Sequence, residues 1–126
     1  MSVLNLHRIE VDRTNDGVAI IAVEGEHDIS TVPSLRDELG AVIRKGTPLV
    51  IDLTGATFLD SSVLRALLEA RQQAEKQNLG FAVALDSSEA PGVKRVLEIT
   101  GLMSVFPVLP ARERAIETAR SRHMHK

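Results

Sequence analysis

Short continuous apolar runs alternate along the chain with stretches in which apolar residues recur every three or four positions. The runs are rich in β-branched residues and are bounded by turn residues, which predicts buried strands. They are Val18–Gly25, Pro48–Leu53, Phe81–Leu85 and Val105–Leu109. A looser alternation between Leu4 and Val11 predicts a half-exposed strand before them. Asp16-Gly17 is a turn signal, so the first two strands are expected to form a hairpin.

The stretches between the runs have the period of amphipathic helices. Ser30 or Thr31 can cap the first helix, and Gly46 ends it. The second helix follows Asp60 and ends near the sequence "NLG" at residues 78–80. The predicted apolar stripes are Val32, Leu35, Leu39, Val42 and Ile43; Val63, Leu64, Leu67 and Leu68; Val93, Val96 and Leu97; and Ala115, Ile116 and Ala119.

The order β-β-α-β-α-β-α-β-α predicts an α/β fold with a mixed, mostly parallel sheet of about five strands, because strands that alternate with helices are joined by crossovers. Pro107 has no amide hydrogen, so the last strand is expected at an edge or a bulge. We expect one domain over residues 1–126, with a core from about 4 to 120 and a frayed tail at 121–126. The predicted core residues are Val18, Ile20, Leu35, Leu39, Val50, Ile51, Leu64, Leu67, Leu68, Val83, Val96 and Leu97.

Composition restricts the possible functions. Of 126 residues, 44% are hydrophobic and 25% are charged, which is typical of a globular protein. The formal net charge is −2, so no basic surface for nucleic acid is expected. The chain has three Phe, no Tyr and no Trp, which leaves few side chains on which bases could stack. It has no Cys, which excludes disulfides and thiolate metal sites.

The first residues lack a basic segment followed by a continuous apolar stretch, so no signal peptide is expected. No apolar run approaches the roughly 18 residues that would span a bilayer. The sequence "SSEAPG" lacks the Lys of a phosphate-binding P-loop, and no cofactor is expected. These features predict a soluble cytoplasmic protein that does not insert into a membrane. A monomer or weak dimer is expected.

The sequence Asp60-Ser61-Ser62-Val63 stands where the loop "TGATFLDSS" (54–62) leads into a predicted helix. Asp60 or one serine can cap the helix, because their oxygens accept the free amides of its first turn. The same amides and the helix dipole favour negative charge, so a serine there can carry a phosphate without unfolding the helix. A nucleophilic serine would need a base, and only His27 is plausible. The G-x-S-x-G motif of α/β hydrolases is absent, which disfavours a hydrolase.

A second polar cluster, Glu24 to Asp28, follows the strand at 18–25 and is expected to form a loop. If the two preceding strands are parallel neighbours, Asp28 and Ser62 emerge at the same end of the sheet, where open α/β sheets bind ligands. Asp28 can also simply cap the next helix. Glu24, Glu26, Asp28 and Asp60 could in principle bind a metal ion, but their spacing matches no metal motif.

The residues described so far resemble the STAS domain, and within it the anti-sigma factor antagonists of the SpoIIAA type. The matching segments stand in the right order over about Val11 to Ala119. They are "VEGEHDISTVPSLRDEL", "VIDLTGATFLDSSVLRALLEA", "GVKRVLEITGL" and "VFPV". The resemblance implies a STAS-like domain whose helices pack mainly on one face of a mixed sheet.

The resemblance also implies a function that is not enzymatic. Proteins of this type bind an anti-sigma factor, commonly a serine kinase of the histidine-kinase-like ATPase class, and so release a sigma factor. The kinase phosphorylates the antagonist, and a PP2C-type phosphatase restores it. Carried onto this chain, Ser62 is the phosphoacceptor, flanked by Asp60 and Ser61, with Asp28 nearby in the partner-binding surface.

Two residues depart from the family pattern. His27 stands where an apolar residue is common, and Val63 stands where Gly is usual. Both are expected on the same surface, where Val63 should slow phosphorylation by crowding Ser62. The alternatives are a constitutive STAS interaction module that is never phosphorylated, a STAS subunit of a transport or lipid-trafficking system, and, last, a serine hydrolase.

Overall fold

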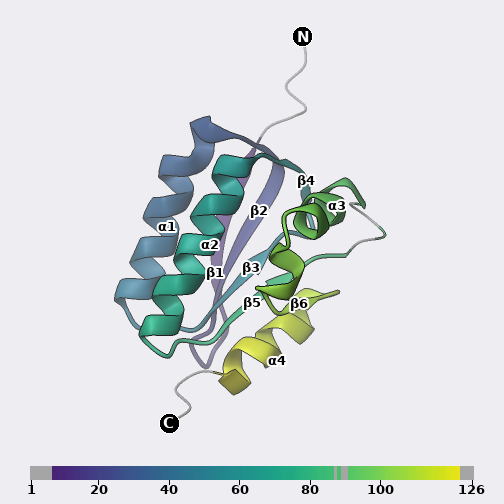
Figure 1. Cartoon of the computed structure of the whole chain (residues 1–126). Helices are drawn as coiled ribbons and strands as arrows, with labels where there is room; N and C mark the ends of the chain where they lie inside the picture. Colours follow the sequence, from purple (N-terminus) through teal and green to yellow (C-terminus); the bar gives the residue numbers. More distant parts are fainter. Residues whose placement is uncertain (1–6, 87, 89–90, 123–126) are drawn as a thin grey trace.

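The computed structural model describes residues 7–86, 88 and 91–122. Within these residues the chain forms a sheet flanked by helices (Figure 1). The elements are β1 (Arg8–Arg13), β2 (Ala19–His27), the short 3₁₀ helix η1 (Ile29–Thr31), α1 (Val32–Arg44), β3 (Leu49–Asp52), β4 (Ala56–Leu59), α2 (Ser61–Lys76), β5 (Phe81–Ala84), α3 (Pro91–Ile99), the 3₁₀ helix η2 (Leu102–Ser104), β6 (Val108–Leu109) and α4 (Arg112–Arg122).

The sheet has the order β1-β2-β3-β5-β6, with β4 paired to the far end of β2. β1 is antiparallel to β2, and the other neighbours are parallel. The predicted hairpin and the mostly parallel sheet are therefore confirmed. β6 lies at an edge directly after Pro107, as expected from the missing amide of that residue. Leu4 and Leu6 of the predicted first strand, and residues 123–126 of the predicted tail, lie outside the described residues, whereas Ser121 and Arg122 belong to α4.

β4 is not predicted by the sequence pattern and β2 extends beyond its predicted end at Gly25, so the sheet has six strands rather than about five. Residues 54–62 were expected to be a loop, but Ala56–Leu59 pairs with Gly25–His27. Gly25 has a φ of +82°, and the register shifts between Gly25 and Glu26. A glycine in this conformation permits a bulge that bends the strand without ending it. The polar residues after Gly25 thus continue β2, and only Asp28 follows it.

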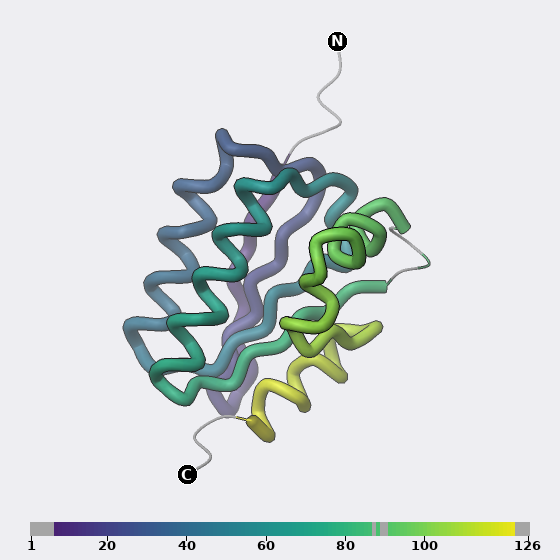
Figure 2. The backbone as a smooth tube through the Cα atoms, in the orientation of Figure 1, coloured from purple at the N-terminus to yellow at the C-terminus, as the bar shows by residue number. Residues whose placement is uncertain are grey.

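The two faces of the sheet are covered differently. Alternate strand residues such as Ile21 and Ile51 pack against α1, α2 and α3, and this larger core contains most of the buried apolar side chains. α1 and α2 run side by side over that face (Figure 2). The other face, which includes Val50 and Ala82, is covered by α4 through Ala115 and Ala119. Helices thus lie mainly on one face.

Most of the predicted core residues are buried. Leu35, Leu67 and Leu97 are fully inaccessible. Leu68 and Val96 are only partly buried, and they pack at the margin of the larger core. Both residues belong to the predicted apolar stripes of their helices. Each lies at the border of its stripe, where neighbouring helices leave the side chain partly exposed.

Ion pairs hold α4 to the sheet in addition to its small apolar face. Arg112 Nε donates to Asp52 Oδ2 at 2.7 Å. Arg120 donates from Nε and Nη2 to the two oxygens of Asp16 at 2.5 and 3.0 Å. These hydrogen bonds, together with one from Thr14, lower the pKa of Asp16 to about 2. The carboxylate therefore stays charged down to a pH of about 2.

Arg120→Gln is expected to raise the pKa of the Asp16 carboxyl partway to its ordinary value of 3.8, since the bond from Thr14 remains. A lowered pKa stabilises the folded state above the unfolded pKa, and this contribution is lost as the pH falls toward about 2. A ¹³C NMR titration of the carboxyl measures the change. Arg114→Gln, on the same helix, should leave the Asp16 pKa unaltered. If both variants gave the wild-type pKa, Arg120 would not be the cause.

Candidate functional site

The ends of β2 and β4 bring the Asp28 and Asp60 turns together. His27 and Leu59 are partners in the parallel pairing, and the Asp60 amide donates to the His27 carbonyl at 3.3 Å. Asp28 and Asp60 come directly after these two residues. The turns therefore lie side by side at one end of the sheet, as the sequence predicted, although β4 rather than β3 provides the second strand end.

Asp60 is the N-cap of α2. Its Oδ1 accepts hydrogen bonds from the amides of Ser62 and Val63 at 3.0 and 3.3 Å. It also accepts the Ser62 hydroxyl at 2.6 Å. Ser61 is exposed and is the first residue of the helix. Of the residues that could cap α2, Asp60 does so, and its carboxylate holds the half-buried Ser62 hydroxyl at the N-terminus of the helix.

Asp28 forms an equivalent turn. Its Oδ1 accepts the amide and the hydroxyl of Ser30 at 2.9 and 2.6 Å. These two hydrogen bonds, the hydroxyl first, lower the pKa of the Asp28 carboxyl. Asp28 thereby caps η1, whereas Thr31, at the N-cap position of α1, makes no side-chain capping bond. The edge thus presents two Asp-x-Ser turns next to each other.

The same local geometry occurs at the ends of two further strands. Asp52, the last residue of β3, accepts the Thr54 hydroxyl at 2.7 Å, and Asp86, beyond the end of β5, accepts the Ser88 hydroxyl at 2.6 Å. Hydrogen bonding of this kind closes a turn by satisfying backbone amides after a strand. The turn geometry by itself therefore does not distinguish Ser62 from the other hydroxyls. What distinguishes it is the position in the long helix α2 and the sequence motif around it.

His27 was expected on the surface, and this prediction was wrong. Its side chain is completely buried. Nε2 donates to the Glu24 carbonyl at 2.8 Å, and Nδ1 lies 3.0 Å from the Thr31 hydroxyl. Because both ring nitrogens are engaged inside the fold, His27 positions the turn that carries Asp28. It is not available as a base for Ser62, whose hydroxyl is bonded to Asp60, so the geometry gives the hydrolase alternative no support.

Val63 was also expected on this surface, and that prediction was wrong as well. Its side chain is 0% exposed and belongs to the larger core. Ser62 and Val63 are consecutive on a helix, so their side chains point about 100° apart around its axis. Val63 therefore packs inward and does not crowd the Ser62 hydroxyl from outside. Val63 thus contributes to the packing beneath Ser62 rather than restricting access to its hydroxyl.

Two exposed apolar side chains at this edge were not identified from the sequence. Ile29, which follows Asp28, is 71% exposed, and Phe58, two residues before Asp60, is 49% exposed. Phe58 is the Cα partner of Glu26 across the β2–β4 pairing. An aromatic residue next to a polar turn, in a segment expected to be a loop, was the available signal for Phe58. Exposed apolar side chains beside charged turns are typical of the centre of a protein interface.

The described part of the chain offers neither a cluster of metal-ligating side chains nor a helix that could span a membrane. Within residues 7–86, 88 and 91–122, no three acidic or histidine side chains lie close enough together to hold a metal ion. Glu24, one of the four acidic residues considered, instead packs its side chain near Gly55. None of the described helices combines the length and the apolar composition needed to cross a bilayer.

Comparison with known proteins identifies the family to which the chain is similar. The sequence model of the STAS domain family matches residues 11–115 of this chain. BtrV of Bordetella bronchiseptica, which carries the name of an anti-sigma factor antagonist, is 34% identical over 79% of this chain and 84% of its own. The anti-sigma-F factor antagonist RsfB of Mycobacterium tuberculosis is 32% identical over 73% of each chain.

The fold comparison leads to the same group of proteins. The crystal structure of an anti-sigma factor antagonist from Mycobacterium paratuberculosis matches with a TM-score of 0.81 and 33% identity, over 95% of this chain and 99% of that one. The family match spans every element from β2 to β6 and includes both Asp-x-Ser turns at the end of the β2–β4 pair. The chain therefore belongs to the STAS domain family.

Proposed function

We propose that this protein is an anti-sigma factor antagonist that binds its partner through the edge formed by the Asp28 and Asp60 turns. The partner is an anti-sigma factor with serine kinase activity of the histidine-kinase-like ATPase class, and its capture releases a sigma factor in the cytoplasm. The observation that carries the proposal is the half-buried Ser62 hydroxyl, held at the N-terminus of α2 beside the Asp28 turn. Relatives named anti-sigma factor antagonists support it.

Phosphorylation of Ser62 is the proposed switch. The phosphate would replace a hydroxyl proton that Asp60 now accepts at 2.6 Å. A phosphoserine carries about −1.5 to −2 charges at neutral pH. The free amides of the first turn of α2 favour this charge, but the Asp60 carboxylate opposes it. The fold is therefore expected to persist while the charge of the edge changes sharply.

The protein is proposed to act by binding rather than by catalysis. A PP2C-type phosphatase would return it to the binding form, and the free protein would be a monomer or weak dimer. Ser62 is a substrate in this scheme, and the chain need supply no base, because the kinase brings its own catalytic groups. The alternative of a constitutive module assumed that Val63 crowds the Ser62 hydroxyl. The Val63 side chain is buried, so it gives that alternative no support.

Phosphate incorporation by the cognate kinase tests the assignment. Wild type and Ser61→Ala are expected to be labelled, and Ser62→Ala is expected to lose the label. Ser30→Ala is the matched control, because Ser30 occupies an identical turn next to the site and is more exposed. Label that disappears in Ser30→Ala or Ser61→Ala but survives in Ser62→Ala would contradict the assignment. Absence of label in wild type that nevertheless binds the kinase tightly would favour the constitutive module.

Ile29 and Phe58 are expected to provide apolar contacts to the partner. Truncating an interface residue of this type to alanine commonly costs about 1–2 kcal/mol, which corresponds to roughly five- to thirtyfold in affinity. We expect Ile29→Ala and Phe58→Ala to weaken binding to the anti-sigma factor by that amount in a calorimetric titration. Val11→Ala is the control, since Val11 is 37% exposed but pairs with Ile21, well away from the end of β2. Equal affinity of all three variants would place the interface elsewhere.

A further inference from the structure

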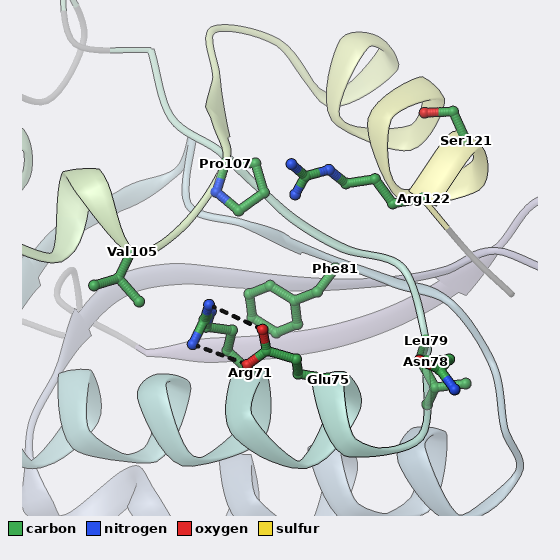
Figure 3. A pocket seen from close by; sticks show the side chains of 9 residues that line it. All are labelled: Arg71, Glu75, Asn78, Leu79, Phe81, Val105, Pro107, Ser121 and Arg122. Carbon is green, nitrogen blue, oxygen red and sulfur yellow. Dashed lines mark hydrogen bonds and ion pairs between the residues drawn. The ribbon is translucent and has the colours of Figure 1, made fainter. Parts of the chain in front are cut away.

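A cavity of about 350 Å³ lies at the opposite end of α2 from Ser62. It is bounded by the last turns of α2, the start of β5, the segment that leads into β6, and the end of α4 (Figure 3). The volume is at the lower end of the roughly 300–1,000 Å³ that is usual for pockets that bind small molecules. Glu75 is 13 residues from Ser62 on the same helix, which corresponds to about 20 Å. A ligand here would not touch the proposed partner surface.

The cavity has an apolar floor. Leu79 and Phe81 are buried, and Val105 and Pro107 are half-buried beside them. The ring of Phe81 lies between the side chains of Arg71 and Glu75 on α2 and that of Arg122 on α4 (Figure 3). Its other neighbour is Phe106, with ring centroids 5.7 Å apart. A flat ring placed on Phe81 would gain the offset stacking that aromatic pairs favour.

Two guanidinium groups flank this floor. Arg71 pairs with Glu75 at 3.3 Å across one turn of α2, so the charges of that pair offset each other. Arg122, at the end of α4, points toward Pro107 from the other side (Figure 3). In the part of the chain that the structure describes, Arg122 makes no ion pair with a carboxylate. The cavity thus combines an apolar floor with one uncompensated positive charge at its rim.

We propose that this cavity binds a small aromatic carboxylate, with the ring on Phe81 and the carboxylate on the guanidinium of Arg122. Arginine is suited to this role because its planar donors match the two oxygens of a carboxylate. Arg71 is the second donor within the same cavity. The site would let a small metabolite bind to the protein independently of the state of Ser62. The inference does not rest on the proposed function, because it concerns different residues at the other end of the fold.

Titration of the ¹⁵N-labelled protein with 1-naphthoate, followed by amide chemical shifts, tests the proposal. A ligand of this size that binds with ordinary efficiency has a Kd of ~1 mM. Saturable shifts are expected at residues 78–81 and 105–106, and none at 28–31 or 60–63. The neutral 1-naphthamide should bind at least threefold more weakly, and inorganic phosphate should cause no saturable shift at these amides.

The matched variants are Arg122→Gln and Arg114→Gln, which both replace an exposed arginine of α4. Arg122→Gln should raise the Kd for 1-naphthoate three- to tenfold, and Arg114→Gln should leave it unchanged. Absence of saturable shifts at residues 78–81 in wild type would overturn the proposal. Equal binding of naphthoate and naphthamide, or an equal Kd for the two variants, would overturn the role of the carboxylate and of Arg122.

Discussion

Phosphorylation of Ser62 is expected to weaken binding to the anti-sigma factor by roughly thirty- to several-thousandfold. The phosphate would have to lose its hydration shell inside the interface, next to the Asp60 carboxylate that now accepts the Ser62 hydroxyl. An unpaired charge buried in this way costs on the order of 2–5 kcal/mol, and each 1.4 kcal/mol is about tenfold in affinity. Because the first turn of α2 tolerates negative charge, the loss arises at the interface and not from unfolding.

Calorimetric titration of the anti-sigma factor with unmodified and Ser62-phosphorylated protein measures this effect. The thermal unfolding midpoint of the two forms should differ little. Ser121→Asp adds a negative charge to an exposed serine at the other end of the fold and should leave the affinity unchanged. Equal affinity of the phosphorylated and unmodified protein would contradict the switch even if Ser62 proved to be the modified residue.

Leu67→Ala is expected to lower the free energy of unfolding by about 2–5 kcal/mol, because it removes buried methyl groups and leaves a cavity that the neighbours only partly fill. Leu67 is 0% exposed and lies in the larger core between α2 and the sheet. Native proteins are stable by only about 5–15 kcal/mol, so this one change can remove a large share of the total.

Leu68→Ala is the matched control, since it is the same substitution at the next position of the same helix. Leu68 is only partly buried, so its truncation should cost clearly less than that of Leu67. Urea denaturation followed by circular dichroism measures both values. A cost for Leu67→Ala below 1 kcal/mol, or a larger cost for Leu68→Ala, would show that the helix face has been assigned incorrectly.

Much of the fold could be predicted from the sequence because most elements are long or strongly apolar. The fully buried residues Ile51 and Val83 lie in continuous apolar runs, and Leu35 and Leu39 have clear helical spacing. β4 could not be predicted in this way. It has four residues, of which Thr57 and Phe58 are exposed, and its pairing with β2 depends on the bulge at Gly25. Pairing between distant segments leaves no periodic signal in either of them.

The site could be predicted only in part for a related reason. Asp28, Asp60 and Ser62 have polar side chains after apolar strands, and polar residues in such positions lie on the surface. The burial of His27 depends on hydrogen bonds to Glu24 and Thr31, which no local pattern records. Val63 is the first residue of the apolar stripe of α2, and that stripe faces the sheet from the first turn onward. The resemblance to the family motif, in which Gly is usual at this position, led us to expect Val63 at the surface. The helical period instead places its side chain on the buried face of α2.

Hydrogen–deuterium exchange of the protein, alone and with its cognate anti-sigma factor, tests the central claim most directly. Binding at the edge of the two turns should slow exchange at residues 28–31 and 58–63, and leave residues 77–81 at the far end of α2 unchanged. Phosphorylation of Ser62 should abolish the protection at the partner concentration that saturates the unmodified protein. Protection confined to α4 or to residues 77–81, with the Asp28 and Asp60 turns unaffected, would contradict the account.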